Sequence, residues 1–171
     1  MLHSSHRRRA TRALVLRVVS EDGIMSDVRI EHATDADRTA VFTLLDSEGL
    51  PLAGLAEHFA HALVARQHGQ VVGSAALEVY DRGALLRSVA VSRALRGTGL
   101  GVRLTEEAIA RARALGSPAV YLLTTTAGGF FPRFGFAPIT RDEVPESVKA
   151  SVEFRSACPA SAIVMRKLLN D

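Results

Sequence analysis

The residues with the clearest chemical signature form the glycine-rich run RGTGLG at residues 96–101. A buried apolar stretch, Leu85–Val91, precedes this run, and a helical pattern that ends at Gly116 follows it. Glycine lets backbone N–H groups turn inward and come close to an anion, and a helix N-terminus adds partial positive charge at the same point. The run therefore predicts a phosphate-binding loop, with a simple tight turn between strand and helix as the alternative.

The spacing of these glycines distinguishes between kinds of anion-binding loop. A P-loop requires Gly, four residues and then Gly-Lys-Ser or Gly-Lys-Thr, and the sequence contains no such run, which argues against nucleotide hydrolysis. A dinucleotide-binding loop requires the order G-x-G-x-x-G, whereas this run reads Arg-x-x-Gly-x-Gly. We therefore expect the loop to bind the phosphates of a different cofactor.

Length and composition favour one folded domain. A chain of 171 residues, 47% of them hydrophobic, can bury one sizeable core. No apolar run approaches the roughly 18 residues of a membrane span, so we expect a soluble protein without a membrane partner. The single cysteine, Cys158, excludes an internal disulfide bond and fits the reducing cytoplasm.

The net charge of +3 comes from the first 24 residues, which contain five arginines and two acidic residues. Basic and acidic side chains are equal in number in the rest of the chain, so the folded part lacks the charge pattern of a nucleic-acid-binding protein. Arg17 interrupts the apolar stretch of this segment, which argues against a signal peptide. We expect residues 1–24 to be disordered or to precede a true start at Met25, and residues 25–171 to form the domain.

Periodicity and turn residues predict the elements that position the loop. Alternating apolar residues predict strands, apolar residues at helical spacing predict helices, and Gly or Pro marks most connections. The result is a mixed α/β fold. Strands are expected at residues 28–33, 61–67, 71–80, 85–91, 119–125, 137–141 and 160–168, and helices at 34–49, 52–59, 100–116 and, as a short aromatic segment, near 130–134.

A second motif, FFPRFGF at residues 130–136, follows the long helix and the next strand. Together with the glycine run and the element order βααβββαβαββ, this motif resembles the GNAT acyltransferases, and the resemblance covers residues 27–169. In that family the Arg-x-x-Gly-x-Gly loop binds the pyrophosphate of acetyl-coenzyme A (acetyl-CoA). The resemblance implies a central mixed, mostly antiparallel sheet, flanked by helices, that splays open at the acyl-CoA site.

The resemblance also assigns residues to acetyl-CoA, the expected co-substrate. Backbone groups of the central strand would hydrogen-bond the pantetheine arm, and the N–H of Val91 would stabilise the oxyanion that forms when an amine attacks the thioester. The loop would hold the pyrophosphate, and two phenylalanines would pack along the cofactor or fill the core. The residues assigned in this way are Val89, Val91, Arg96, Gly97, Thr98, Gly99, Leu100, Gly101, Phe130 and Phe131.

Acetyl transfer to an amine requires a base for the ammonium and an acid for the departing thiolate. Many GNAT proteins have a tyrosine as the acid where this sequence has Phe131. Tyr121, a water molecule or direct loss of the thiolate remain as alternatives. Glu78, acting through water, is the first candidate for the base, with a solvated surface carboxylate as its alternative interpretation, and Glu153 is the second candidate.

Arg87 is the candidate for substrate recognition, because an arginine inside an apolar strand is costly unless it meets an anion. Period-two alternation predicts that its side chain lies on the same face of the strand as Val89 and Val91. The anion is either a substrate carboxylate held in a bidentate fork or the carboxylate of a structural salt bridge. Arg155, in a polar loop before the last strand, is the second candidate.

The segments LLRSVAV, YLLTTTAGGFFPRFGF and EFRSACPASA are similar to GNAT proteins encoded with arsenic-resistance genes and to short glutamate N-acetyltransferases of arginine biosynthesis. The resemblance implies acetylation of the primary amine of a small, carboxylate-bearing, amino-acid-like substrate by direct attack, in arsenic or antimetabolite resistance or in arginine biosynthesis. A non-catalytic acyl-CoA-binding regulatory module is the alternative from another class, because the usual tyrosine is missing. A homodimer remains open.

We expect no metal site. One thiol, that of Cys158, is a poor site for a soft metal, so its expected role is structural. His58 and His61 are three residues apart on an expected helix, but no third ligand accompanies them.

Overall fold

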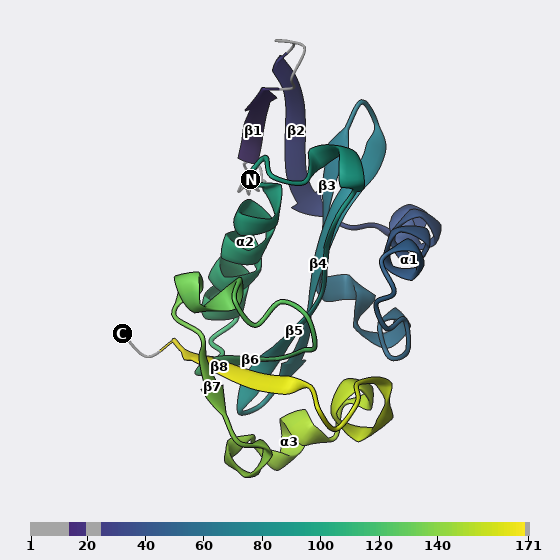
Figure 1. Ribbon diagram of the computed structural model, residues 1–171. Coiled ribbons are helices and arrows are strands. Elements are labelled where there is room, and N and C mark those ends of the chain that lie inside the picture. Colours follow the sequence, from purple (N-terminus) through teal and green to yellow (C-terminus); the bar gives the residue numbers. More distant parts are fainter. Residues whose placement is uncertain (1–13, 20–24, 170–171) are drawn as a thin grey trace, which may run out of the picture.

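The computed structural model describes residues 14–19 and 25–169. In this part of the chain, the strands form one mixed sheet in the order β1-β2-β3-β4-β5-β6-β8-β7, in which only the β5–β6 pair is parallel (Figure 1). The predicted mixed, mostly antiparallel sheet is confirmed. The strands are β1 Leu14–Val19, β2 Met25–His32, β3 Ala62–Gln67, β4 Gln70–Tyr80, β5 Gly83–Val91, β6 Ala119–Thr124, β7 Ala137–Ile139 and β8 Ile163–Leu168, and the α-helices are α1 Arg38–Ser47, α2 Leu100–Ala114 and α3 Glu146–Lys149.

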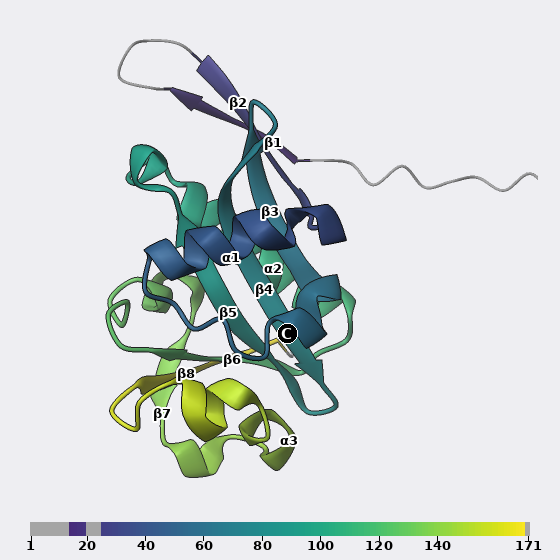
Figure 2. The ribbon, with the colours of Figure 1, turned by 90° about the vertical axis from the view of Figure 1, so that its right-hand side faces the viewer.

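The sheet has a helix on each face. Helix α2 packs against β4 and β5 on one face, and α1 lies across the same strands on the other, as Figures 1 and 2 show from two directions. Leu100, Leu104 and Ala108 lie one helical turn apart and are buried in the α2-side core. Val41 and Leu45 are buried in the separate α1-side core. The central strands β4 and β5 are therefore covered on both faces.

The extension predicted to be disordered or absent contains strand β1, which pairs antiparallel with β2 from Leu14↔Ile30 to Val19↔Met25. Strand β2 offers residues 14–19 a free edge beyond its pairing with β3. Residues 1–13 and 20–24 lie outside the described residues. The domain boundary at Met25 stays a prediction.

Most predicted elements are present, with two local differences. The helix expected at residues 52–59 is only a 3₁₀ segment, Ala56–His61, preceded by a loop in which Gly54 has φ +82°. The last strand begins at Ile163 rather than Ala160, because residues 153–157 form a π-helical turn and a loop follows. Both irregular segments approach the same buried side chain, Arg87, which explains why local propensity does not determine their shape.

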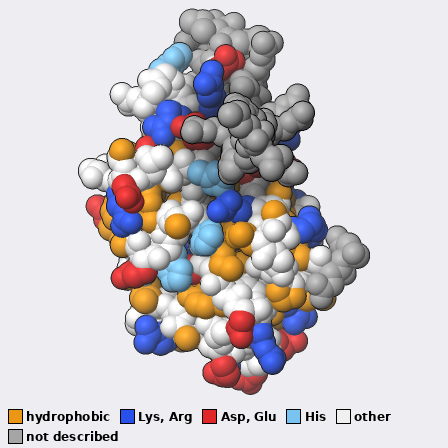
Figure 3. Space-filling view, turned by 180° about the vertical axis from the view of Figure 1, so that it is seen from behind, with side chains coloured by type: hydrophobic (Ala, Val, Ile, Leu, Met, Phe, Trp, Pro, Cys, Tyr) orange, Lys and Arg blue, Asp and Glu red, His pale blue; other side chains and the backbone are white. Residues whose placement is uncertain are grey.

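Charges of both signs and histidines are interspersed with hydrophobic side chains on the face seen from behind in Figure 3. On α2, Arg111 contacts two histidine rings, with Nη1 3.3 Å from His32 Nε2 and Nη2 3.2 Å from His61 Nδ1. Burial, followed by the charge of Arg111, lowers the pKa of both histidines. Across the described ranges, no helix is both long enough and apolar enough to cross a bilayer.

Candidate active site

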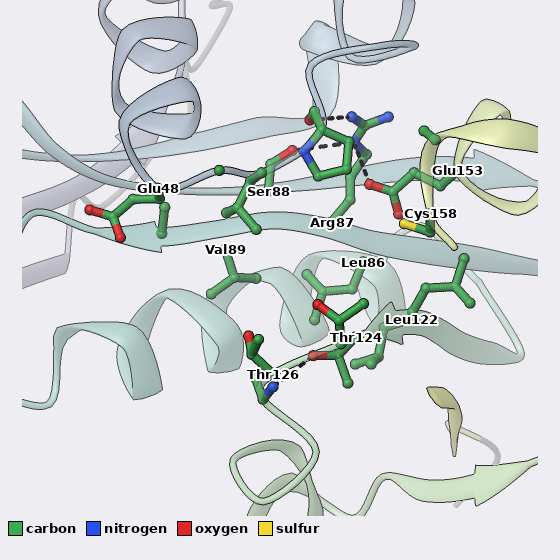
Figure 4. Close-up of a pocket in the computed structure, with 18 of the residues that line it drawn as sticks. Glu48, Leu86, Arg87, Ser88, Val89, Leu122, Thr124, Thr126, Glu153 and Cys158 are labelled. Carbon is green, nitrogen blue, oxygen red and sulfur yellow. Dashed lines mark hydrogen bonds and ion pairs between the residues drawn. The ribbon is translucent and has the colours of Figure 1, made fainter. Parts of the chain in front are cut away.

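The sheet opens between β5 and β6, its one parallel pair within the described residues. Strands β5 and β6 pair at Ala84↔Val120 and Leu85↔Tyr121 and then separate. A cleft of about 490 Å³ occupies the opening, between residues 86–91 of β5 and 122–124 of β6 (Figure 4). The predicted splay at the end of the central strand is therefore present in the described sheet.

A β-bulge in β5 changes the direction of its side chains. The register with β4 shifts between Ser74↔Ala90 and Ala76↔Arg87, and Ser88 has φ +58°. Val89 consequently packs on the α2 side of the sheet, whereas Arg87 points to the α1 side, and Figure 4 shows the two side chains on opposite sides of the strand. The prediction that Arg87 shares a face with Val89 and Val91 is wrong, because the bulge interrupts the two-residue alternation.

The backbone at the end of β5 faces the cleft. The N–H of Ser92 donates to the carbonyl oxygen of Val72 on the β4 side at 2.8 Å. Because backbone groups of successive strand residues point to alternate edges, the N–H and C=O of Val91 point away from β4, toward β6. Val91 also lines the cleft, so its N–H can reach a group that lies between the two strands.

The glycine-rich loop follows Arg96, the residue of the RGTGLG run that lines the cleft. Gly97 and Gly99 have φ values of +78° and +85°, a conformation that glycine adopts without strain. The first backbone bond of α2 runs from the N–H of Arg103 to Gly99 at 3.1 Å, so the N–H groups of the preceding helical residues have no intrahelical partner. The Thr98 hydroxyl does not cap these N–H groups but donates to the Leu95 carbonyl at 2.6 Å. The loop therefore presents free N–H groups at a helix N-terminus, which suits a phosphate.

Arg96 lines one end of the cleft and forms an ion pair with Glu48, which also lines it. Glu48 lies at the C-terminus of α1, distant in sequence from the loop, and the sequence analysis did not single it out. Three consecutive threonines, 124–126, line the opposite wall. The Thr124 hydroxyl accepts a hydrogen bond from the N–H of Ala127 at 2.9 Å and holds the turn after β6.

The two phenylalanines have different positions. Phe131 is buried and lines the cleft, whereas Phe130 is half-buried next to the loop, within van der Waals reach of Gly101. Their rings meet edge to face at 5.1 Å. The Arg133 guanidinium lies 4.7 Å from the Phe130 ring centroid. Both rings thus belong to the core on the α2 side and border the loop or the cleft.

Arg87 is the centre of a buried polar network on the α1 side. Its Nη1 donates to the Ala53 carbonyl at 2.9 Å, its Nη2 donates to Pro51 at 3.1 Å, and its Nε donates to the Ser88 hydroxyl at 3.2 Å. Two carboxylates flank the guanidinium. Glu78 Oε2 lies 3.7 Å from Nη1, and Glu153 Oε1 lies 3.5 Å from Nε. Arg87 therefore forms ion pairs inside the protein and also lines the cleft, and its role in binding a substrate carboxylate stays a prediction.

Glu153 lines the cleft at the end opposite Glu48 (Figure 4). Burial raises the pKa of Glu153 to about 7, the positive charge of Arg87 opposes this rise, and the negative charge of Glu78 adds to it. Cys158 lies beside it in the cleft wall, and burial, followed by the charge of Glu153, raises the pKa of the thiol to about 11. The cleft thus contains a carboxyl group that exchanges its proton near neutral pH beside a thiol that stays protonated.

The other predicted catalytic and substrate residues lie off the cleft. Glu78 is buried behind Arg87. Its Oε1 lies 2.9 Å from His58 Nε2 and accepts a hydrogen bond from the Tyr80 hydroxyl at 3.3 Å. Tyr121 is buried on the side of Leu85 and α3, and Arg155 is exposed. Neither Tyr121 nor Arg155 lines the cleft. In the described ranges, no three His, Cys, Asp or Glu side chains gather at a point suited to a metal ion.

A mixed sheet that opens at one parallel strand pair, with a glycine-rich turn into a helix beside the opening, is the architecture expected of an acyl-CoA-dependent acyltransferase. The Acetyltransferase (GNAT) domain matches residues 58–138. An uncharacterised N-acetyltransferase of Chlorobaculum tepidum is 31% identical over 150 residues, which cover 81% of this chain and 96% of the relative. The chain belongs to the GNAT acetyltransferase family, and it is an acetyl-CoA-dependent acyltransferase.

Other relatives act on amino acids, according to their names. An amino-acid acetyltransferase of Neisseria meningitidis is 29% identical over 149 residues, which are 82% of this chain and 34% of the relative. N-acetylglutamate synthase of Neisseria gonorrhoeae, solved with coenzyme A and N-acetyl-glutamate, has a TM-score of 0.73 at 24% identity, covering 84% of this chain and 35% of that one. The chain thus spans about a third of these longer proteins.

A Mycobacterium tuberculosis protein, solved in complex with CoA and a second ligand, is matched over almost the whole length of its own chain. The match has a TM-score of 0.71 at 26% identity and covers 82% of this chain and 98% of that one. The fold of this chain therefore occurs also as a stand-alone domain. The connection with arsenic resistance stays a prediction.

Proposed function

We propose that this protein transfers the acetyl group of acetyl-CoA to the primary amine of a small, carboxylate-bearing, amino-acid-like molecule. The observation that carries the proposal is the separation of β5 and β6 beyond Leu85 and Tyr121. The resulting cleft is lined by β5 along one wall, by Arg96, which begins the glycine loop, near Glu48 at one end, and by Glu153 at the other (Figure 4). An acyl donor and an amine acceptor can therefore enter from opposite ends and meet at the end of β5.

In this proposal the α2 side of the cleft holds acetyl-CoA. The free N–H groups of residues 97–101 and the Arg96 side chain bind the pyrophosphate, and Phe130 and Phe131 pack along the cofactor. Backbone groups of Val89 and Val91 align the pantetheine arm. The N–H of Val91 stabilises the oxyanion of the tetrahedral intermediate, a role for which removal of one donor in other enzymes costs roughly 3 to 4 kcal/mol.

The amine attacks the thioester carbonyl directly, and the C–S bond breaks in the second step to release CoA. Phe131 has no proton to give, and Tyr121 lies off the cleft, so a water molecule or the attacking nitrogen itself supplies the proton to the sulfur. The thiol of Cys158 lies in the cleft wall with a raised pKa and stays protonated, which makes it an unsuitable nucleophile at neutral pH. Direct transfer is therefore preferred to an acetyl-cysteine intermediate.

The amino-acid part of the proposal is supported by the names of the relatives, which include amino-acid acetyltransferases and an N-acetylglutamate synthase. Arg87 supports it less directly. Three of its five N–H groups already donate to Pro51, Ala53 and Ser88, so a substrate carboxylate would have to bind the remaining N–H groups of Nη1 and Nη2. The acceptors to test first are glutamate and amino acids with an arsenic- or phosphorus-based acid group in the side chain.

The test is release of free thiol from acetyl-CoA in the presence of amine acceptors. The panel contains the common amino acids, glutamate analogues with phosphinic or arsinic groups, and a lysine peptide as the comparison from a different substrate class. Rapid turnover of one amino acid, with the N-acetyl product confirmed by mass spectrometry, supports the proposal. Turnover of the peptide alone refutes the amino-acid class.

A regulatory module that binds acyl-CoA without catalysis is the second candidate, and Phe131 in the usual place of a tyrosine is the observation that favours it. The same assay distinguishes the two candidates. Tight binding of CoA in calorimetry, combined with no thiol release for any amine, supports the regulatory module and excludes the transferase.

A further inference from the structure

We propose that Glu153 is the residue that accepts the proton of the substrate ammonium. The charges of Arg87 and Glu78, which lie next to it, adjust how readily Glu153 binds this proton. This inference rests on the proposed function, because it names the base of the same reaction. It reverses the order of the two sequence-based candidates for the base. Glu78, the first candidate, becomes a positioning residue.

The positions of the two carboxylates favour Glu153 over Glu78 as the base. Both carboxylates flank Arg87, but only Glu153 lines the cleft. The oxygens of Glu78 face His58, Tyr80 and Arg87, and Glu78 Oε2 is sealed from solvent without a hydrogen-bond donor. A substrate amine in the cleft can therefore meet the carboxylate of Glu153 without any rearrangement, whereas it cannot meet Glu78.

The carboxylate of Glu153 is also free to accept a proton. Among the described residues, none donates a hydrogen bond to it, and the nearest cationic nitrogen, Arg87 Nε, lies at 3.5 Å and donates to Ser88 instead. A buried carboxylate with so few partners is costly, which is typical of groups that are completed by a ligand. An ammonium group, with three N–H donors and a positive charge, is the chemical complement of this carboxylate.

The charges around Glu153 set its proton affinity. The groups that face it are Arg87 from β5, Glu78 from β4 and the neutral thiol of Cys158 from its own loop. Burial and Glu78 favour the protonated form, and Arg87 favours the ionised form, so that the pKa comes to about 7. A general base is most effective when its pKa lies near the working pH, because the ionised form is then populated and still basic.

The reaction balances with this assignment. The ammonium transfers one N–H proton to the Glu153 carboxylate, and the nitrogen lone pair forms the C–N bond with the thioester carbon. The tetrahedral intermediate collapses with cleavage of the C–S bond, and the second nitrogen proton goes to the departing sulfur, which leaves as the thiol of CoA. Glu153 then releases its proton to water. One acetyl group is transferred, and one proton is released to solution per turnover.

The experiment combines turnover with a direct titration of the carboxyl group. Turnover is measured from pH 5.5 to 9 with acetyl-CoA and L-glutamate, or with the amine that the acceptor panel identifies. Titration uses carbon-13 NMR of protein with labelled glutamate carboxyls and needs no substrate. Glu153→Gln should lower kcat by at least about 100-fold with little change in the KM for acetyl-CoA, and it should remove one carboxyl resonance that titrates near pH 7.

Two variants test the tuning. Arg87→Met should move the rising limb of the pH profile and the NMR titration to higher pH, and Glu78→Gln should move both to lower pH. A merely structural role for Arg87 and Glu78 would lower activity without moving either curve. Glu78→Gln is the decisive variant if Arg87→Met fails to fold, because the amide keeps the shape and can still accept the hydrogen bond from Tyr80.

Glu146→Gln is the matched control. Glu146 is an exposed glutamate of the neighbouring helix α3, paired with Lys149, and its replacement should change neither kcat nor the pH profile. Equal turnover by the Glu153→Gln variant and the wild type would overturn the inference, as would the absence of a carboxyl titration near pH 7. Failure of the proposed function has a different signature, because the wild type would then release no thiol with any amine.

Discussion

Replacing Glu153 with Gln should stabilise the protein at pH 8 even though it is expected to lower kcat by at least about 100-fold. The folded state raises the pKa of Glu153 from 4.5 to about 7, so the folded state binds the proton more tightly than the unfolded chain does. Its contribution to stability is therefore fully present below about pH 4.5 and is lost as the pH rises through about 7. Glutamine keeps the shape of the side chain and never ionises, so it avoids this loss.

The magnitude follows from the size of the shift. A change from 4.5 to about 7 corresponds to a free-energy difference of roughly 3 kcal/mol between the two protonation states. The variant should exceed the wild type by about 3 kcal/mol at pH 8, and by only about 0.4 kcal/mol near pH 4.5. Such a gain on removal of a functional group is the usual conflict between stability and activity.

Urea denaturation of the wild type and the Glu153→Gln variant, followed by circular dichroism at pH 4.5, 6, 7 and 8, measures this difference. The Glu146→Gln control should show the same free energy of unfolding as the wild type across the series, because that side chain is exposed. A difference that does not depend on pH, or a variant that is less stable than the wild type at pH 8, would refute the account of Glu153 as a buried carboxyl group with a raised pKa.

Three further predictions concern the cleft and the residues excluded from it. Arg96→Gln should raise the KM for acetyl-CoA but leave the KM for S-acetyl-pantetheine, which lacks the pyrophosphate, unchanged; equal increases would show that Arg96 does not bind the pyrophosphate. Gly99→Ala should cost about 1 to 2 kcal/mol of stability, measured by calorimetry, because alanine is strained at φ +85°, and it should also weaken acetyl-CoA binding by moving the loop N–H groups. Tyr121→Phe should keep kcat within twofold because Tyr121 lies off the cleft, and a large loss would restore Tyr121 as the acid.

The sequence was most informative where the physical cause is local. The glycine run predicted a turn before a helix N-terminus, and the structure has this turn, in which Gly97 and Gly99 have positive φ values. Apolar periodicity predicted α2, β4 and β5 close to their observed bounds, because burial on one or both faces requires such patterns. The helix expected at residues 52–59 was wrong in type, since contacts with distant residues rather than propensity determine that segment.

The site was harder to predict than the fold. Alternation predicted the face of Arg87 incorrectly, because a bulge adds a residue to a strand and nothing in a single sequence marks its position. Tyr121 was proposed as an acid from its place on the strand next to the central one, but β6 pairs with β5 at that residue, before the sheet opens. Nothing in the sequence placed Glu48 at the site, because its ion pair with Arg96 joins segments far apart in the chain.

The sequence by itself determined the family of this protein, the glycine-rich loop before α2 and the order of its elements, because each depends on residue types within a short window. The tertiary structure decided which carboxylate is free to act. Glu78 and Glu153 have the same side chain, and the sequence ranked Glu78 first. Only the folded chain brings both beside Arg87, buries one behind it and leaves the other in the cleft, because burial and Coulomb interactions depend on distances in space.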